Sequence, residues 1–294
     1  MLETVGVTST PVLASTVTAT PVPVVPIPTP VQTPTPPSGP PPPRASGDRP
    51  APVLGARAAV LIDSDSGAVL FDQDAHTPLP PASTTKIVTA LLAVERGDLD
   101  DVVEVQLDGR AYWGSVMGLQ NGDRFTLRDL LYGMMLPSGN DAAYTIAAYL
   151  AGSEPAFADM MNARMRALGL TENDFKNASG LGREGTNVIS AHDLAQVARF
   201  AMRNPEFARV VGTRSYVARG SRTISFGNGN ELLSRYAGAD GVKIGWGGRF
   251  GGNTIVGTAV RNGHRLFVAL LDTPDRAGES ARLLDWGFTA FRWE

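Results

Sequence analysis

Apolar and polar positions change period along the chain, and each change predicts an element of secondary structure. Two apolar runs, Arg57–Asp63 and Ala68–Asp72, flank the turn-forming sequence Ser64–Gly67 and predict a β-hairpin. A helical period follows from about Thr84 to Glu95, and Gly97 marks its end. The first folded elements are therefore expected to be two strands and then a helix.

Helical periodicity dominates the middle of the chain, and strand-like patterns return near its end. Strands at both ends with helices between them predict a mixed α/β (α+β) fold, in which one sheet is built from both termini and a helical lobe is inserted. The later helices are expected at Leu127–Met135, Asp141–Ala151, Pro155–Leu168, Ser190–Met202 and Arg276 to about Phe291, and the later strands at Gly241–Trp246, Asn253–Arg261 and His264–Leu271.

The first 54 residues differ in composition from the rest. Fifteen of the chain's 22 prolines precede residue 53, and the stretch Pro21–Pro43 is expected to be extended polyproline II. We predict a Pro/Thr-rich disordered linker over residues 1–54 and one folded domain over residues 55–294. The tract has no basic segment followed by an apolar one, so no export signal is visible, and we expect a signal or an anchor upstream.

Charge and composition exclude several classes of function. The net charge is −3, which favours neither nucleic acid nor an anionic membrane surface as a partner. No apolar run approaches the ~18 residues of a transmembrane segment. The absence of cysteine excludes thiol catalysis and disulfides. The histidines, His76, His192 and His264, lie far apart without the spacing of metal ligands, so we expect them to be solvated or at the edge of the core and predict no metal.

Lysine is rare in this chain, and two lysines stand in motifs. Only Lys86, Lys176 and Lys243 occur among 26 basic residues. Codon bias is one explanation; another is that lysine was kept where arginine cannot serve, because only lysine can lose its proton in a protein. In Ser83-Thr84-Thr85-Lys86 the two outer residues would lie one turn apart on one helical face. A capping serine with an exposed lysine is the simpler interpretation of this motif alone.

Two further motifs follow the first in a fixed order. Ser138-Gly139-Asn140 lies in a turn between two expected helices, where a polar cap would also be usual. Lys243-Ile244-Gly245 lies on an expected strand, and a glycine there often marks the close approach of a ligand or of another backbone.

The order S-x-x-K, S-x-N, K-x-G resembles the penicillin-binding and serine β-lactamase superfamily. Within it the chain is similar to the low-molecular-mass, serine-type D-alanyl-D-alanine carboxypeptidases. This resemblance implies a β-lactamase/transpeptidase-like fold with an antiparallel sheet, over about Ala58 to Phe288. Besides the three motifs, it rests on Pro80–Ala82, Leu136–Pro137, Asp141–Ala143, Met161–Asn162, Asn177–Leu181, Ala191–Ala195 and Asp240–Val242.

The resemblance implies a role for each motif residue. Ser83 matches the nucleophile that forms the acyl-enzyme, and Lys86 matches the base that activates it. Ser138 matches the proton relay toward the leaving D-alanine, and Asn140 the side chain that holds the substrate amide. Lys243 matches a second cation that keeps the site positive. No cofactor is implied.

The K-x-G motif departs from the family pattern. The usual K-T-G threonine, whose hydroxyl helps to hold the substrate carboxylate, is Ile244, followed by Gly245 and Trp246. The resemblance places the oxyanion hole at the backbone N–H groups of Ser83 and Trp246. Arg249 lies in the glycine-rich stretch beyond them. It is a candidate to compensate in part for the missing threonine, and a solvated surface arginine is the simpler interpretation.

The chain is therefore predicted to remove the terminal D-alanine from peptidoglycan stem peptides outside the cytoplasm, with β-lactams as covalent inhibitors. A cross-link endopeptidase and a catalytically weakened peptidoglycan-binding protein stay open as alternatives. A class A β-lactamase is disfavoured because no Glu-x-x-Leu-Asn segment follows the second motif, and an α/β-hydrolase because G-x-S-x-G is absent.

Overall fold

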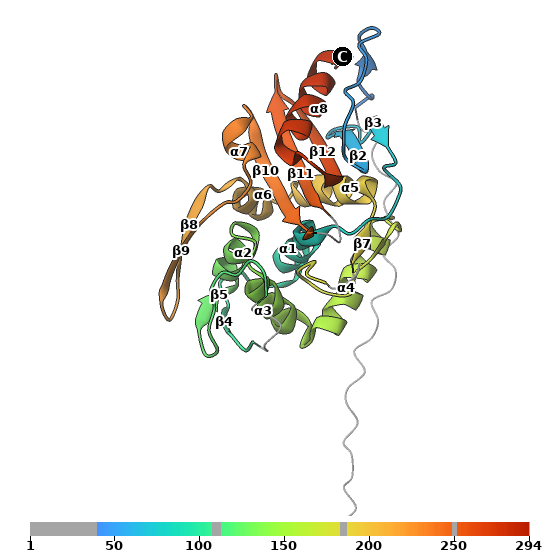
Figure 1. The fold of residues 1–294 in the computed structure, drawn as a ribbon. Coiled ribbons are helices and arrows are strands. Elements are labelled where there is room, and N and C mark those ends of the chain that lie inside the picture. The colour runs from blue at the N-terminus through green and yellow to red at the C-terminus, as the bar shows by residue number, and fades with distance from the viewer. Residues whose placement is uncertain (1–39, 108–112, 183–186, 249–251, 294) are drawn as a thin grey trace, which may run out of the picture. The chain divides into compact units, whose positions relative to one another are not determined.

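A five-stranded antiparallel sheet organises the folded part of the chain (Figure 1). The structure, a computed structural model, describes residues 40–107, 113–182, 187–248 and 252–293. The strand Ala58–Asp63 pairs with His264–Thr273, the last of three C-terminal strands, and Val69–Gln73 pairs with Ala58–Asp63 at the edge, so the sheet is built from both ends of the chain, as predicted. In spatial order the strands are β10 (Ala239–Trp246), β11 (Asn253–Arg261), β12 (His264–Thr273), β2 (Ala58–Asp63) and β3 (Val69–Gln73).

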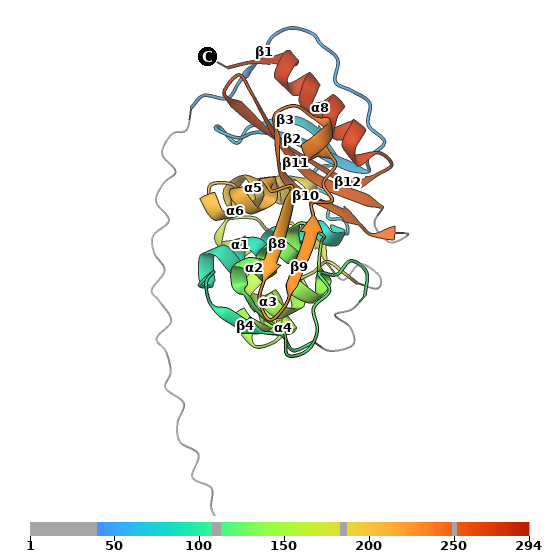
Figure 2. The same ribbon diagram turned by 90° about the vertical axis from the view of Figure 1, so that its left-hand side faces the viewer.

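Both faces of this sheet are covered, which explains the unbroken apolar runs of its central strands. All six residues of β2 are buried, and alternate side chains enter different cores because successive residues of a strand point to opposite faces. One face packs against the helical lobe and the other against helix α8 (Arg276–Ala290), as Figures 1 and 2 show. The first core receives Ala58, Val60, Ile62, Phe267 and Ala269, and the second receives Ala59, Leu61, Leu266, Val268, Leu283 and Leu284.

The inserted lobe is helical and is built around α1 (Lys86–Arg96), whose residues Lys86–Ala93 are all buried. Side-chain caps fix several helix starts: Thr126 accepts a hydrogen bond from Asp129 N, and Ser190 accepts one from Asp193 N. The remaining helices are α2 (Leu127–Met135), α3 (Asn140–Ala151), α4 (Glu154–Ala167), α5 (Ala191–Ala201), α6 (Pro205–Gly212) and the short α7 (Leu232–Arg235).

Several short elements were not predicted from the sequence. Strands of two to five residues are too short to show a hydrophobic period, and tertiary contacts decide whether they pair. Besides α6 and α7, these elements are the strand pairs β4 (Val102–Glu104) with β5 (Arg124–Thr126), β6 (Asn173–Asp174) with β7 (Val188–Ile189), and β8 (Ser215–Arg219) with β9 (Thr223–Gly227).

Part of the stretch that composition assigned to the linker contacts the folded domain. Strand β1 (Arg44–Ala45) pairs with β13 (Phe291–Arg292), and the indole N–H of Trp286 donates to the carbonyl oxygen of Arg49 at 3.2 Å. Leu54 is buried in the second core. Within the described ranges, no helix is both long enough and apolar enough to cross a lipid bilayer.

Candidate active site

Ser83 lies in a 3₁₀ turn, η1 (Ala82–Thr85), that leads directly into α1. The α-helix thus begins at Lys86, later than the expected start at Thr84. The tighter turn keeps Ser83 and Lys86 on one face, and the Lys86 Nζ lies 3.0 Å from the Ser83 Oγ. The turn is anchored at Pro81, whose carbonyl oxygen accepts hydrogen bonds from the hydroxyls of Thr84 (2.6 Å) and Thr254 (2.9 Å).

The side chain of Lys86 is fully buried and has three polar neighbours. Its Nζ lies 2.7 Å from Asn140 Oδ1 and 2.8 Å from the carbonyl oxygen of Ser179, in addition to Ser83 Oγ. Two of these partners can only accept hydrogen bonds, so a neutral amine can donate to both and direct its lone pair at the Ser83 hydroxyl.

The electrostatic surroundings of Lys86 favour this neutral form. Burial lowers the pKa of Lys86 well below its ordinary value, and the nearby charge of Lys243 lowers it further, whereas the Asp141 carboxylate raises it. A buried lysine with a lowered pKa is suited to take the proton of a serine hydroxyl.

Asn140 is held in one orientation at the first turn of α3. Its side-chain NH₂ donates to the carbonyl oxygen of Trp113 at 2.6 Å, which leaves Oδ1 facing Lys86. The next residue, Asp141, is buried and accepts hydrogen bonds from the backbone N–H groups of Met117, Gly118 and Leu119 at 2.8–2.9 Å. These bonds tie the segment before α2 to the start of α3.

Ser138 adopts a left-handed backbone conformation, with φ of 68°, in the turn between α2 and α3. Such a conformation is uncommon for a residue with a side chain and occurs often at functional sites. Its hydroxyl oxygen is buried and has no hydrogen-bond partner in the described part of the chain. The hydroxyl is therefore available to a bound ligand.

The carbonyl of Ser179 belongs to the site, although the sequence gave it no role. The Asn177 Oδ1 accepts hydrogen bonds from Ser179 N (3.2 Å) and Gly180 N (2.8 Å), which shapes a tight loop. Gly180 has φ of 76°, and a Cβ there would lie 1.8 Å from the carbonyl oxygen of Ala82, so only glycine fits against the turn that holds Ser83. In the sequence, the family resemblance of Asn177–Leu181 was the only signal that this loop belongs to the site.

The strand β10 places Lys243, Ile244 and Gly245 beside η1. A Cβ on Gly245 would lie 2.9 Å from Ser83 N, so the missing side chain lets the strand approach the nucleophile. Lys243 is buried, and its Nζ donates to the Ile244 carbonyl oxygen at 2.9 Å. Burial, and then the charge of Arg276, lowers the pKa of Lys243 to about 7. Trp246 follows with its side chain largely exposed.

Arg276, the first residue of α8, was missed by the sequence analysis because it lies more than thirty positions beyond the third motif. Its Nη1 lies 3.4 Å from the carbonyl oxygen of Gly245, and its Nε donates to Glu231 at 2.8 Å. The guanidinium therefore adds positive charge close to the K-x-G strand. Arg249, to which the sequence analysis gave a similar role, lies outside the described residues.

The sequence model of the D-alanyl-D-alanine carboxypeptidase family matches residues 46–275. The chain belongs to this family. It is 37% identical to the D-alanyl-D-alanine carboxypeptidase DacB2 of Mycobacterium tuberculosis over 253 residues, which cover 83% of this chain and 86% of the relative. The D-alanyl-D-alanine carboxypeptidase of Streptomyces sp. strain K15 is 35% identical, with 81% and 88% covered.

Solved structures support the same assignment. A mutant of the Streptomyces K15 DD-transpeptidase superposes with a TM-score of 0.76 at 33% identity, covering 81% of this chain and 99% of that one. The D-alanyl-D-alanine carboxypeptidase from M. tuberculosis gives a TM-score of 0.76 at 35% identity, with 83% and 95% covered. The predicted family, fold class and type of enzyme are confirmed, and the roles of individual residues stay predictions.

Proposed function

We propose that this chain is an extracytoplasmic carboxypeptidase that removes the terminal D-alanine from peptidoglycan stem peptides through an acyl-enzyme on Ser83. The observation that carries the proposal is the 3.0 Å contact between Ser83 Oγ and the buried Lys86 amine, whose pKa is lowered. The similarity to proteins named D-alanyl-D-alanine carboxypeptidases supports the choice of substrate.

In the acylation step, neutral Lys86 accepts the proton of the Ser83 hydroxyl as Oγ attacks the carbonyl carbon of the D-Ala-D-Ala peptide bond. The carbon–nitrogen bond then breaks, and the proton held by Lys86 passes through the Ser138 hydroxyl to the departing amine of D-alanine, which leaves Lys86 neutral again. The buried Ser138 Oγ, which has no partner among the described residues, is suited to this relay. Water afterwards hydrolyses the ester and restores Ser83.

The negative charge that develops on the carbonyl oxygen is assigned to the backbone N–H groups of Ser83 and Trp246. The close approach of Gly245 to Ser83 N brings β10 and η1 together at this point. Loss of one such preorganised donor typically costs about 3–4 kcal/mol of transition-state stabilisation.

The substrate's terminal carboxylate is assigned to the positive charge around β10. Lys243 is buried there, and Arg276 lies against the Gly245 carbonyl. Ile244 offers no hydroxyl to this carboxylate, unlike the threonine usual in the family. We keep Arg249 as a further candidate on the sequence argument.

Labelling with penicillin tests the proposal, because a β-lactam acylates the same serine that attacks the peptide. The intact chain should gain the mass of one penicillin on the peptide containing Ser83, and Ser83→Ala should gain none while its melting temperature stays nearly the same. The intact chain should also release D-alanine from a diacyl-lysyl-D-alanyl-D-alanine peptide. An adduct that persists on Ser83→Ala would overturn the assignment of the nucleophile.

A cross-link endopeptidase is the second candidate, and Ile244 is the observation that favours it. An endopeptidase cleaves the bond between a D-alanine and a second stem peptide, so its leaving group is not a free terminal D-alanine. The site then has less need of a hydroxyl at position 244 to hold a terminal carboxylate. Comparing rates on a linear pentapeptide and on a cross-linked muropeptide dimer separates the two activities. Faster cleavage of the dimer would replace the carboxypeptidase proposal.

A further inference from the structure

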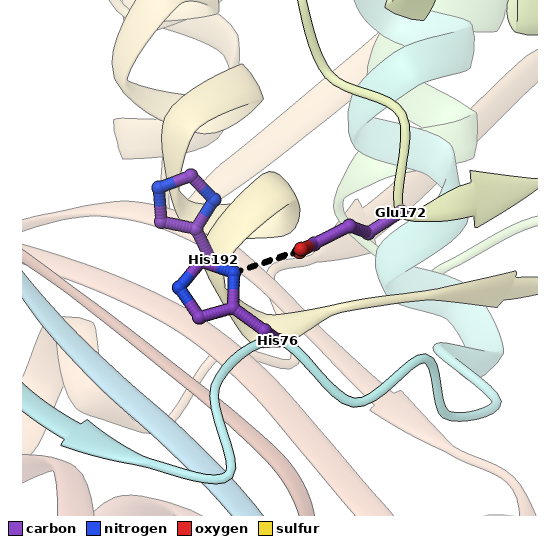
Figure 3. Close-up of side chains that lie close together, drawn as sticks. All are labelled: His76, Glu172 and His192. Atoms are coloured by element: carbon purple, nitrogen blue, oxygen red, sulfur yellow. Dashed lines mark hydrogen bonds and ion pairs between the residues drawn. The ribbon is translucent and has the colours of Figure 1, made fainter.

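The fold brings together two histidines that the sequence gave no reason to connect. His76 follows β3, His192 lies in the first turn of α5, and their rings stack with centroids 4.6 Å apart at an interplanar angle of 30°. Glu172, just before β6, lies at the edge of the stack (Figure 3). A sequence separation of more than a hundred residues is closed where the segment after β3 packs on the start of α5 and His192 N donates to the Ala75 carbonyl oxygen.

We propose that His76, Glu172 and His192 form a binding site for one divalent transition-metal ion, with Zn²⁺ as the preferred ion. One ligand atom from each of the three side chains lies within 4.8 Å of the others. The His76 Nδ1 is 2.9 and 3.0 Å from the two carboxylate oxygens of Glu172. Two ligands at the usual zinc distances of about 2.0–2.1 Å lie about 3.3 Å apart in a tetrahedron, so this pair needs a shift of only a few tenths of an ångström.

Carboxylates behind the histidines complete the arrangement. The His192 Nδ1 lies 3.3 Å from Asp193 Oδ1, and the His76 Nε2 lies 3.9 Å from Asp72 Oδ2. A carboxylate on one ring nitrogen orients a histidine and makes its other nitrogen the metal ligand. His192 would therefore bind through Nε2. His76 would bind through Nδ1, which already faces Glu172, while Asp72 lies near its Nε2 beyond hydrogen-bond distance. The His192 Nε2 is 3.5 Å from the side-chain nitrogen of Gln196, which would turn aside on metal binding.

The charge and the accessibility of the site suit a cation from solution. Glu172, Asp72 and Asp193 surround the two imidazoles, and the side chains of His76, Glu172 and His192 are 54%, 32% and 22% exposed. Two histidines and one carboxylate are a usual zinc ligand set, which leaves a fourth position for water. Imidazole ligands favour zinc, copper or nickel over magnesium or calcium.

The backbone holds the three ligand segments in place without a metal. His192 N donates to the Ala75 carbonyl oxygen, and Ser190 N donates to the Glu172 carbonyl oxygen, each at 2.9 Å. The segment after His76 is paired with β7 through Leu79 and Ile189 and continues to the turn that holds Ser83. An ion at this site would therefore bind beside the segment that leads to the nucleophile without entering the catalytic machinery.

Competition with a chromophoric zinc chelator tests the proposal on the full chain. We expect one Zn²⁺ per chain, at least 10-fold weaker binding for Glu172→Gln, and at least 100-fold weaker binding for His76→Ala and His192→Ala. His264→Ala is the matched control, because His264 stacks on Trp293 instead and should bind Zn²⁺ like the parent chain. The Co²⁺-loaded parent chain should show the intense visible absorption of a four-coordinate ion, and the His192→Ala chain should lose it.

Three outcomes would overturn the site: no stoichiometric zinc binding by the parent chain, unchanged affinity in both histidine variants, or an equal loss of affinity in His264→Ala. Penicillin labelling of Ser83 should continue in all four variants. A parent chain that labels normally but binds no zinc would therefore refute the metal site alone and leave the proposed function intact.

Discussion

Lys86 and Ser83 are joined by a 3.0 Å contact across the junction of a 3₁₀ turn and an α-helix, in a part of the molecule where the lysine is fully buried. The other two neighbours of the amine are the oxygens of Asn140 and Ser179, which only accept hydrogen bonds. In its neutral form the amine can donate to both of these oxygens and still accept the proton of the Ser83 hydroxyl through its lone pair.

Replacing Lys86 with arginine tests whether the amine acts as a base. Arginine keeps the charge but cannot give up its proton, so the rate of acylation by penicillin should fall by about 100-fold or more. Stopped-flow acylation rates measure this, with Lys176→Arg as the control because Lys176 is exposed and pairs with Asp174. A near-normal rate for Lys86→Arg would mean that the lysine contributes only its charge.

The pH dependence of acylation should report the two buried lysines. The amine of Lys86 accepts a proton only above its own lowered pKa, so the rate should fall at acid pH. Lys243 has its pKa lowered to about 7 and loses its charge above that value, so the rate should also fall at alkaline pH. The expected profile of kcat/KM is bell-shaped.

Substitution of Lys243 by arginine separates the two limbs of this profile. Arginine stays charged at alkaline pH, so the alkaline limb of kcat/KM should move to higher pH even if the maximum is lower. The acid limb should remain, because Lys86 is intact. If the alkaline limb does not move, a group other than Lys243 controls it.

Restoring the family's threonine tests the role of Ile244. A hydrogen bond to a charged group contributes roughly 1.5–3 kcal/mol, so Ile244→Thr should raise kcat/KM for D-Ala-D-Ala peptides by about 10–100-fold. Isoleucine and threonine are both β-branched and suit a strand, so the fold should tolerate the change. The release of D-alanine measures the effect.

A double-mutant cycle locates the arginine that compensates for Ile244. Arg249→Ala and Arg276→Ala should each be measured with isoleucine and with threonine at position 244. The arginine that binds the carboxylate should show a large loss of kcat/KM beside Ile244 and a smaller loss beside the threonine. If Ile244→Thr changes nothing, the carboxylate is bound elsewhere and the endopeptidase gains support.

Truncation tests how much of the N-terminal tract the folded domain needs. A chain that begins at Pro40 keeps the pair between β1 and β13, and it should melt like the full chain. A chain that begins at Val53 loses this pair and the Arg49–Trp286 hydrogen bond. Each hydrogen bond contributes about 0.5–1.5 kcal/mol to the free energy of unfolding, so the melting temperature of this shorter chain should fall by several degrees. Penicillin labelling should continue in both, since Ser83 and Lys86 lie elsewhere; equal melting temperatures would show that these contacts add no stability.

The sequence by itself determined the elements and motifs that depend on local order. The period of apolar residues located the five sheet strands and most helices, with Asn253–Arg261 placed to the residue. The spacing of Ser83 and Lys86 put them on one face because one turn of helix separates them. The order of the three motifs identified the family, because residue types and their spacing can be recognised in the sequence without knowledge of the packing.

The tertiary structure alone decided which distant segments meet. The Ser179 carbonyl reaches Lys86 across 93 positions, Arg276 lies against Gly245 from the start of α8, and His76 stacks on His192. Hydrophobic periodicity reports which face of an element is buried but not which other element covers it. These contacts depend on how the helical lobe and α8 pack on the two faces of the sheet, so no pattern within a single element contains them.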